Sequence, residues 1–223
     1  MKRYSQNNEQ DIILDYLTRN NLTKGKLLDI GALDGERLSN TRAIMETYAE
    51  WSGVFVDASP YSFVKLVDLY KMEPRRATLI NLAIVPEDML DGSPILEFYE
   101  THETKLPILS GVSSSVKNHA HKYGFEEVNA DGDPVNPRTT YVGKVGMREL
   151  LTRFGPSFDF INIDVEGYSA RLVMQDWFDL RNYGCKLLCV EHDGLYRQIQ
   201  EKLLLSGYSV LGLNGENIIM AKL

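Results

Sequence analysis

Acidic side chains follow two apolar stretches in the second half of the chain. Residues 158–167, FDFINIDVEG, carry Asp164 and Glu166 just after the apolar part. Residues 187–194, LLCVEHDG, continue from an apolar part into Glu191, His192 and Asp193. Short apolar stretches of this kind are typical of buried strands, and the carboxyl ends of neighbouring parallel strands open into one crevice. We therefore expect Asp164, Glu191, His192 and Asp193 to converge on a site of chemistry. Glu166 is expected to start the following turn, where it can cap backbone N–H groups or bind the cation of a partner.

Two kinds of chemistry suit this group. A carboxylate or an imidazole can take the proton of a hydroxyl during attack, and we predict that catalytic role for Asp164 and His192. Alternatively, a divalent cation, magnesium or manganese, lowers the pKa of the hydroxyl and anchors the acceptor. The expected metal ligands are Asp164, Glu191 and His192, with Asp193 as a further candidate. A third interpretation is that Glu191 and His192 only hydrogen-bond to nearby loops.

A glycine-containing loop follows the first apolar stretch of the chain. Residues 27–41, LLDIGALDGERLSNT, contain the pattern D-x-G-x-x-x-G, formed by Asp29, Gly31 and Gly35. Dinucleotide enzymes instead carry G-x-G-x-x-G, where a pyrophosphate rests on the start of a helix. Asp29 and Asp34 would repel a pyrophosphate. They suit a ligand that carries an amine and hydroxyl groups.

Asp57 stands near the end of the next apolar stretch, GVFVDAS, residues 53–59. An acid at this place can accept hydrogen bonds from both ribose hydroxyls of an adenosine. An amine, a ribose and an adenine without pyrophosphate describe S-adenosylmethionine, and the sequence favours this cofactor. The alternative is that Asp29 and Asp57 are ordinary loop and capping acids.

Strand-like and helix-like segments alternate along most of the chain. The spacing of apolar residues predicts helices over 8–20, 38–50, 60–72, 145–154, 168–181 and 194–205. It predicts strands over 26–31, 53–59, 77–85, 158–164 and 185–191. This alternation indicates a mostly parallel, doubly wound α/β sheet with right-handed crossovers. Residues 207–223 form two strand-like runs joined by Asn214-Gly215, a dipeptide that tolerates positive φ angles, and predict a closing antiparallel hairpin.

Residues 86–141 interrupt this alternation. They contain ILEFYE, which alternates like an edge strand, and stretches rich in Gly, Ser, Asn and Asp. We expect one domain over residues 1–223, in which this irregular insertion covers the site of the acceptor.

The quoted motifs together resemble the FkbM-type S-adenosylmethionine-dependent methyltransferases. The resemblance runs through YSQNNEQDIIL, LLDIGALDGERLSNT, GVFVDASP, IDVEG and LLCVEHDG. It implies a Rossmann-like methyltransferase fold, with a mostly parallel seven-stranded sheet and a C-terminal antiparallel hairpin. It also implies O-methylation of a hydroxyl on a sugar, glycan or related small molecule. The cofactor contacts that it implies are Asp29, Gly31, Ala32, Asp57 and Ser59, with Asn81 and Ala83 beside the adenine. The loop pattern adds Asp34 and Gly35 to the expected cofactor site.

Composition limits the other classes of function. The chain of 223 residues carries a formal charge of -7 without runs of like charge, which argues against a nucleic-acid binder. The amino terminus lacks the apolar core of a signal peptide, and no apolar stretch approaches the ~20 residues of a membrane span. Cys185 and Cys189 read as core thiols, which fits a reducing cytoplasm. A non-catalytic cofactor-binding protein and, less favoured, an NAD-dependent oxidoreductase are the competing interpretations on this fold.

Overall fold

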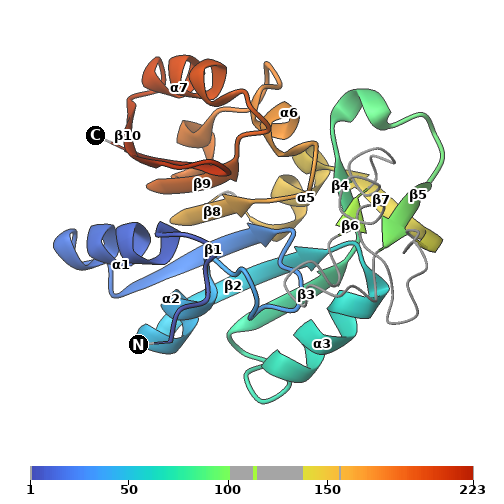
Figure 1. Cartoon of the computed structure of the whole chain (residues 1–223), viewed down its shortest axis with the longest axis horizontal. Helices are drawn as coiled ribbons and strands as arrows, with labels where there is room; N and C mark the ends of the chain where they lie inside the picture. Colours follow the sequence, from blue (N-terminus) through green and yellow to red (C-terminus); the bar gives the residue numbers. More distant parts are fainter. Residues whose placement is uncertain (1, 101–112, 115–137, 156, 223) are drawn as a thin grey trace, which may run out of the picture.

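A seven-stranded sheet forms the body of the protein (Figure 1). The computed structural model describes residues 2–100, 113–114, 138–155 and 157–222. The strand order is β10-β11-β9-β8-β1-β2-β3, and β11 runs antiparallel to both of its neighbours while the other pairs are parallel. The strands are β1 (Lys24–Ile30), β2 (Glu50–Asp57), β3 (Ala77–Asn81), β8 (Phe160–Ile163), β9 (Leu187–Glu191), β10 (Tyr208–Leu213) and β11 (Asn217–Lys222). The mostly parallel sheet closed by an antiparallel hairpin is confirmed.

Helices cover both faces of this sheet, because successive strand residues point to opposite faces and both faces are apolar. One face packs against α1 (Glu9–Arg19), α2 (Arg42–Thr47) and α3 (Pro60–Tyr70). The other face packs against α5 (Met147–Phe154), α6 (Ser169–Val173) and α7 (Tyr196–Leu204). Leu27 and Phe160 bury against the first group, whereas their neighbours Leu28 and Ile161 bury against the second. A 3-10 helix, Leu180–Tyr183, follows α6, so the helix expected over 168–181 is interrupted.

The stretch expected as one strand over 77–85 divides between two sheets. β3 ends at Asn81, and β4 (Ala83–Val85) begins after Leu82. β3 pairs with β2 in the large sheet, but β4 pairs with β7 (Arg138–Gly146) in a second sheet. The side chain of Asn81 donates to the carbonyls of Asp57, 2.8 Å away, and Ala58, 3.1 Å away, and so ties this exit to the end of β2.

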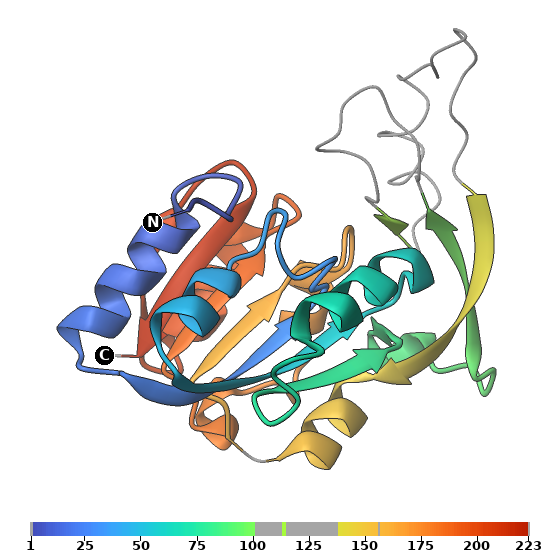
Figure 2. The same ribbon diagram turned by 90° about the horizontal axis from the view of Figure 1, so that it is seen from below.

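The second sheet has the order β4-β7-β5-β6 and stands at one end of the body, beyond β3 (Figure 2). Its other strands are β5 (Ile95–Glu100) and β6 (Ser113–Ser114), and the 3-10 helix Glu87–Met89 precedes them. The insertion is therefore more regular than expected, and ILEFYE lies between two strands, not at an edge. Most of the segment expected to cover the acceptor lies outside the described residues.

The hairpin between β10 and β11 turns by a route other than the expected one. Neither Asn214 nor Gly215 has a positive φ angle. Instead, the side-chain oxygen of Asn214 accepts hydrogen bonds from the backbone N–H groups of Glu216, at 2.9 Å, and Asn217, at 2.8 Å. An Asn side chain that mimics a backbone turn in this way needs no left-handed residue. Among the helices of the described residues, none is long and apolar enough to cross a membrane.

Candidate active site

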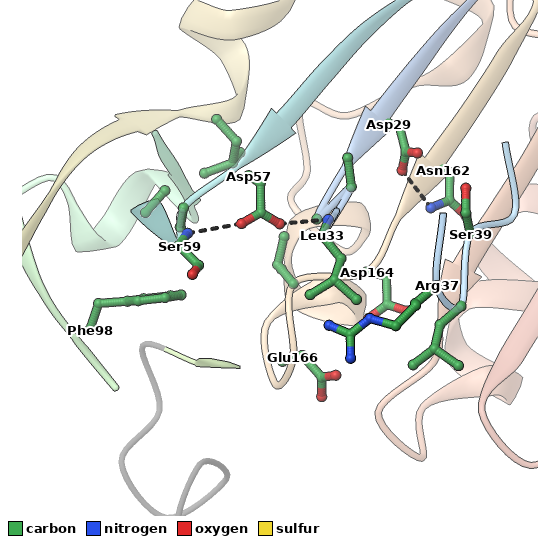
Figure 3. A pocket seen from close by; sticks show the side chains of 17 residues that line it. Asp29, Leu33, Arg37, Ser39, Asp57, Ser59, Phe98, Asn162, Asp164 and Glu166 are labelled. Atoms are coloured by element: carbon green, nitrogen blue, oxygen red, sulfur yellow. Dashed lines mark hydrogen bonds between the residues drawn. The ribbon is translucent and has the colours of Figure 1, made fainter. Parts of the chain in front are cut away.

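A pocket opens at the carboxyl ends of β1, β2 and β8, and Phe98 of β5 also lines it (Figure 3). Its space is about 860 Å³ when the part open to solvent is counted, so the pocket is an open crevice. The structure brings most of the predicted site residues to its walls. Those that line it are Asp29, Gly31, Ala32, Asp57, Ser59, Ala83 and Asp164.

Gly31 follows β1 at a point where the backbone passes close to Asp164, which follows β8. Its φ angle is +88°, and a Cβ built on it would lie 1.6 Å from the carbonyl oxygen of Asp164. No side chain fits there. The backbone N–H of Asp164 also donates to the carbonyl of Ile30 at 2.8 Å, so a hydrogen bond joins the two strand ends next to the glycine. Leu33 and Leu38, in the same loop, also have positive φ, a strain that tends to concentrate at functional sites.

Asp57 connects the loop after β1 to the start of α3. One carboxylate oxygen accepts the N–H of Leu33 at 2.7 Å, and the other accepts the N–H of Ser59 at 2.9 Å. Burial raises the pKa of this carboxyl to about 7, although both hydrogen bonds oppose the shift. A carboxylate can accept about four hydrogen bonds, and these two leave capacity for two ligand hydroxyls.

Asp29 lies in a buried polar network beneath the pocket. One of its oxygens accepts the hydroxyl of Thr41 at 2.6 Å, and the other accepts the amide of Asn162 at 2.8 Å. The Asn162 oxygen accepts the amide of Asn40 at 3.1 Å. Burial raises the pKa of Asp29 to about 6. Asn40, Thr41 and Asn162 were not predicted from the sequence as members of the site, although the polar Asn162 inside the apolar stretch FINI was a usable signal.

Three residues expected to contact the cofactor, Asp34, Gly35 and Asn81, do not line the described pocket. Asp34 accepts the backbone N–H of Arg37 at 2.8 Å and its Nε at 2.7 Å. Gly35 faces α3, where a Cβ would lie 2.7 Å from Leu66. Asn81 braces the end of β2, as described above. Arg37, which the sequence analysis did not single out, lines the pocket beside Asp164 and Glu166 (Figure 3).

Three carboxylates crowd together at the other side of the crevice. Oxygens of Asp164, Glu166 and Glu191 lie within 4.8 Å of one another. Glu191 also accepts the hydroxyl of Ser169 at 2.9 Å, and that hydroxyl accepts the N–H of Val165 at 2.8 Å. Burial, reinforced by repulsion from Glu166, raises the pKa of Asp164 well above its usual range. Burial and the negative charge of Asp164 raise the pKa of Glu191 in the same direction.

His192 does not join these carboxylates. Its Nε2 lies 3.1 Å from the carbonyl oxygen of Asn214, and its Nδ1 accepts the N–H of Gly194 at 3.0 Å. Its backbone N–H donates to the carbonyl of Glu216 at 2.9 Å. The residue is not among those that line the described pocket. Both ring nitrogens therefore hydrogen-bond to backbone groups of loops at this edge of the sheet. Glu166, and not His192, lies with Asp164 and Glu191 where the metal site was expected.

Two solved structures of methyltransferases match the chain at low similarity. A candidate RNA methyltransferase from Pyrococcus horikoshii is 9% identical with a TM-score of 0.47, and the match covers 96% of this chain and 83% of that one. A candidate methyltransferase from Escherichia coli is 10% identical with a TM-score of 0.45, covering 99% and 88%. No curated protein sequence matches the chain.

The family described as the methyltransferase FkbM domain matches residues 29–209. This range begins at Asp29 in β1 and ends inside β10, so it includes the pocket, the second sheet and the three crowded carboxylates. The expected Rossmann-like methyltransferase fold is confirmed, with the strand order given above. The chain belongs to the FkbM family of methyltransferases, which implies S-adenosylmethionine as the methyl donor.

Proposed function

We propose that this methyltransferase moves the methyl group of S-adenosylmethionine to a hydroxyl of a sugar, glycan or related small molecule. The observation that carries the proposal is that one pocket contains both Asp57, suited to ribose hydroxyls, and Asp164, suited to the proton of an acceptor. The nucleoside and the reacting hydroxyl would then lie side by side at the carboxyl edge of the sheet.

The charged residues of the pocket fit this cofactor. Four acidic residues and one arginine line it, namely Asp29, Asp57, Asp164, Glu166 and Arg37. Such an excess of negative charge attracts a sulfonium and an amine and repels the pyrophosphate of NAD. This supports S-adenosylmethionine over the oxidoreductase interpretation. The net charge of -7 likewise supports a small-molecule or glycan acceptor over a nucleic acid.

When bound, S-adenosylmethionine supplies an electrophilic methyl group. A neutral hydroxyl is a poor nucleophile, so its proton must leave as the new bond forms. In this proposal Asp164 accepts that proton. Glu191 contacts Asp164 from the neighbouring strand, and Ser169 holds Glu191 in place. His192, whose ring serves the loops, is assigned no part in the proton transfer.

A divalent cation is the second candidate for activating the hydroxyl. Asp164, Glu166 and Glu191 supply the oxygen ligands that magnesium and manganese prefer. The two candidates differ in one measurement. Activity that is lost with a chelator and restored by magnesium or manganese would assign the cluster to a metal, whereas activity unchanged by chelation would assign Asp164 as the base.

The proposal is tested in two steps. S-adenosylmethionine and its demethylated product should raise the melting temperature of the protein, whereas NAD should not; a ligand at 100 times its Kd adds about 2.7 kcal/mol of stability. Transfer of a labelled methyl group to a panel of monosaccharides, glycans and non-sugar alcohols then identifies the acceptor. Binding without transfer to any acceptor would favour the non-catalytic interpretation, and no binding would refute both.

A further inference from the structure

The second sheet places a buried acid next to the pocket that the proposed chemistry does not use. Glu100 is the last residue of β5, and only 5% of its surface is exposed. The hydroxyl of Ser59 donates a hydrogen bond to its carboxylate. Glu100 also acts on Asp57, because its negative charge contributes to the raised pKa of that carboxyl. A buried carboxylate beside another acid is costly, so its retention at this point calls for a role.

Ser59 is the connection between Glu100 and the pocket. It lines the pocket, is 2% exposed, and follows the ribose-binding candidate Asp57 by two residues. Its hydroxyl has one proton and two lone pairs. The proton is directed at Glu100, and one lone pair accepts the N–H of Ser62 at 3.2 Å, which caps α3. The capacity that remains is one lone pair, so Ser59 can only accept from a ligand.

We propose that Glu100 is a positioning residue that fixes the hydroxyl of Ser59 as a hydrogen-bond acceptor for a donor group of the bound nucleoside. The inference rests on the proposed function. The donor is either the exocyclic amine of the adenine or a ribose hydroxyl, which share the same N–H or O–H chemistry. Glu100 then adds a polar contribution from the second sheet, whose residues Ala83, Ile84 and Phe98 line the same pocket.

The direction of the Ser59 hydroxyl has a consequence for specificity. A hydroxyl that is free to rotate can donate or accept, so it discriminates poorly between a ligand donor and a ligand acceptor. One whose proton is held by a buried carboxylate rejects a ligand acceptor, because two lone pairs would face each other without a proton between them. Loss of Glu100 should therefore reduce the preference for the natural nucleoside.

The test measures binding of S-adenosylhomocysteine by calorimetry, together with its 6-oxo (inosyl), 2′-deoxy and 3′-deoxy analogues. We expect the wild type to prefer the natural ligand over at least one analogue. Glu100→Ala should weaken binding of the natural ligand about fivefold, the effect of one net hydrogen bond, and should reduce that same preference. Glu100→Gln should bind nearly as the wild type does, because an amide oxygen still accepts from Ser59.

A double-mutant cycle shows whether Glu100 acts through Ser59. Ser59→Ala should lower the same preference, and adding Glu100→Ala to it should cost little more. Glu97→Gln, an exposed acid on the same strand, is the matched control and should bind every ligand as the wild type does. Melting curves check that each variant is folded. If Glu100→Ala does not fold, the preference of Ser59→Ala decides: a lowered preference supports the inference and an unchanged one overturns it.

Unchanged preferences in the folded Ser59→Ala and Glu100→Ala variants, or fully additive losses in the cycle, would overturn the inference while leaving the proposed function intact. A wild-type protein that binds no S-adenosylhomocysteine would instead overturn the proposed function, and this inference with it.

Discussion

The acidic residues on the two sides of the crevice have opposite surroundings. On the side of β1 and β2, Asp29 and Asp57 each receive two hydrogen bonds, from hydroxyl, amide or backbone N–H donors. On the side of β8 and β9, Asp164 and Glu191 lie against each other and against Glu166. The first arrangement holds fixed acceptors for a ligand that does not change. The second concentrates repulsion that a proton or a cation relieves, which suits the place where charge moves during the reaction.

The strongest test of this division is Asp164→Asn. The amide keeps the shape of the side chain but cannot take a proton, so we expect kcat to fall about 10²–10⁴-fold. The Kd for S-adenosylhomocysteine should stay close to that of the wild type, because the cofactor side of the crevice is unchanged. Single-turnover kinetics and calorimetry measure the two quantities. A folded variant that methylates an identified acceptor at the parental rate would end the assignment of Asp164.

Gly31→Ala should break the junction between the two sides. The added Cβ overlaps the carbonyl of Asp164 at 1.6 Å, so the strand ends must separate. Gly92→Ala is a matched control, because Gly92 has nearly the same φ angle, +86°, and nothing within 4 Å of the added atom. We expect the control to lose about 1–2 kcal/mol from backbone strain alone and Gly31→Ala to lose at least about 2 kcal/mol more. Urea unfolding measures both, and equal losses would show that the junction tolerates separation.

The positions of the residues on the side of β1 and β2 were predictable from sequence because the signals are local. Gly31 and Asp57 stand directly after apolar stretches, and the end of a parallel strand determines which edge of the sheet they reach. Asn162 was missed because its amide points to Asp29 across a strand pair, and register is not written in either stretch alone. The network beneath the pocket therefore depends on pairing that spacing cannot specify.

The other side was less predictable for reasons of backbone geometry. Glu166 has a φ angle of +51° and Asp193 has one of +47°. A glutamate or an aspartate in the sequence does not by itself predict a positive φ angle. These left-handed residues lie in the turns that follow β8 and β9. Position along the chain alone predicted His192 as a member of the carboxylate cluster, whereas the structure places Glu166 there. The second sheet was missed as well, because β4 pairs with β7 across some sixty residues of sequence, whereas periodicity reports only neighbours.

The pH dependence of cofactor binding should sharpen the role of Asp57. Its pKa is raised to about 7, and ribose hydroxyls donate to the ionised form, so binding should release a proton and tighten as pH rises from about 5 to 8. Because this folded-state pKa lies above the unfolded value, the contribution of Asp57 to stability without ligand is full below pH ~4 and is lost as pH rises through 7. As pH rises, the affinity for the cofactor should therefore increase while the contribution of Asp57 to the stability of the free protein decreases.

Calorimetry in buffers of different ionisation enthalpy measures this proton release directly. Asp57→Asn should abolish the release that depends on this carboxyl and weaken binding by about 1–3 kcal/mol. Asp29, whose pKa is about 6, is the natural comparison, because its two oxygens are already engaged by Thr41 and Asn162. Affinity that stays constant from pH 5 to 8 would remove Asp57 from the ribose site.

The smallest effect on kcat is expected for His192→Ala. This variant tests whether His192 lies outside the region where the reaction takes place. The ring is bonded to the Asn214 carbonyl and to the Gly194 N–H, so its removal should cost about 1–2 kcal/mol of stability by loosening the hairpin turn. kcat should change by no more than a few-fold, and the pH–rate profile should keep its shape, because another group takes the proton. His192→Gln, which can still hydrogen-bond to a loop, should recover part of the stability. A folded His192→Ala protein that loses 10²-fold or more in kcat, with cofactor binding intact, would mean that the imidazole leaves the hairpin during turnover and reaches the acceptor. The reactive region on the side of β8 and β9 would then include both residues that the sequence predicted as catalytic, Asp164 and His192.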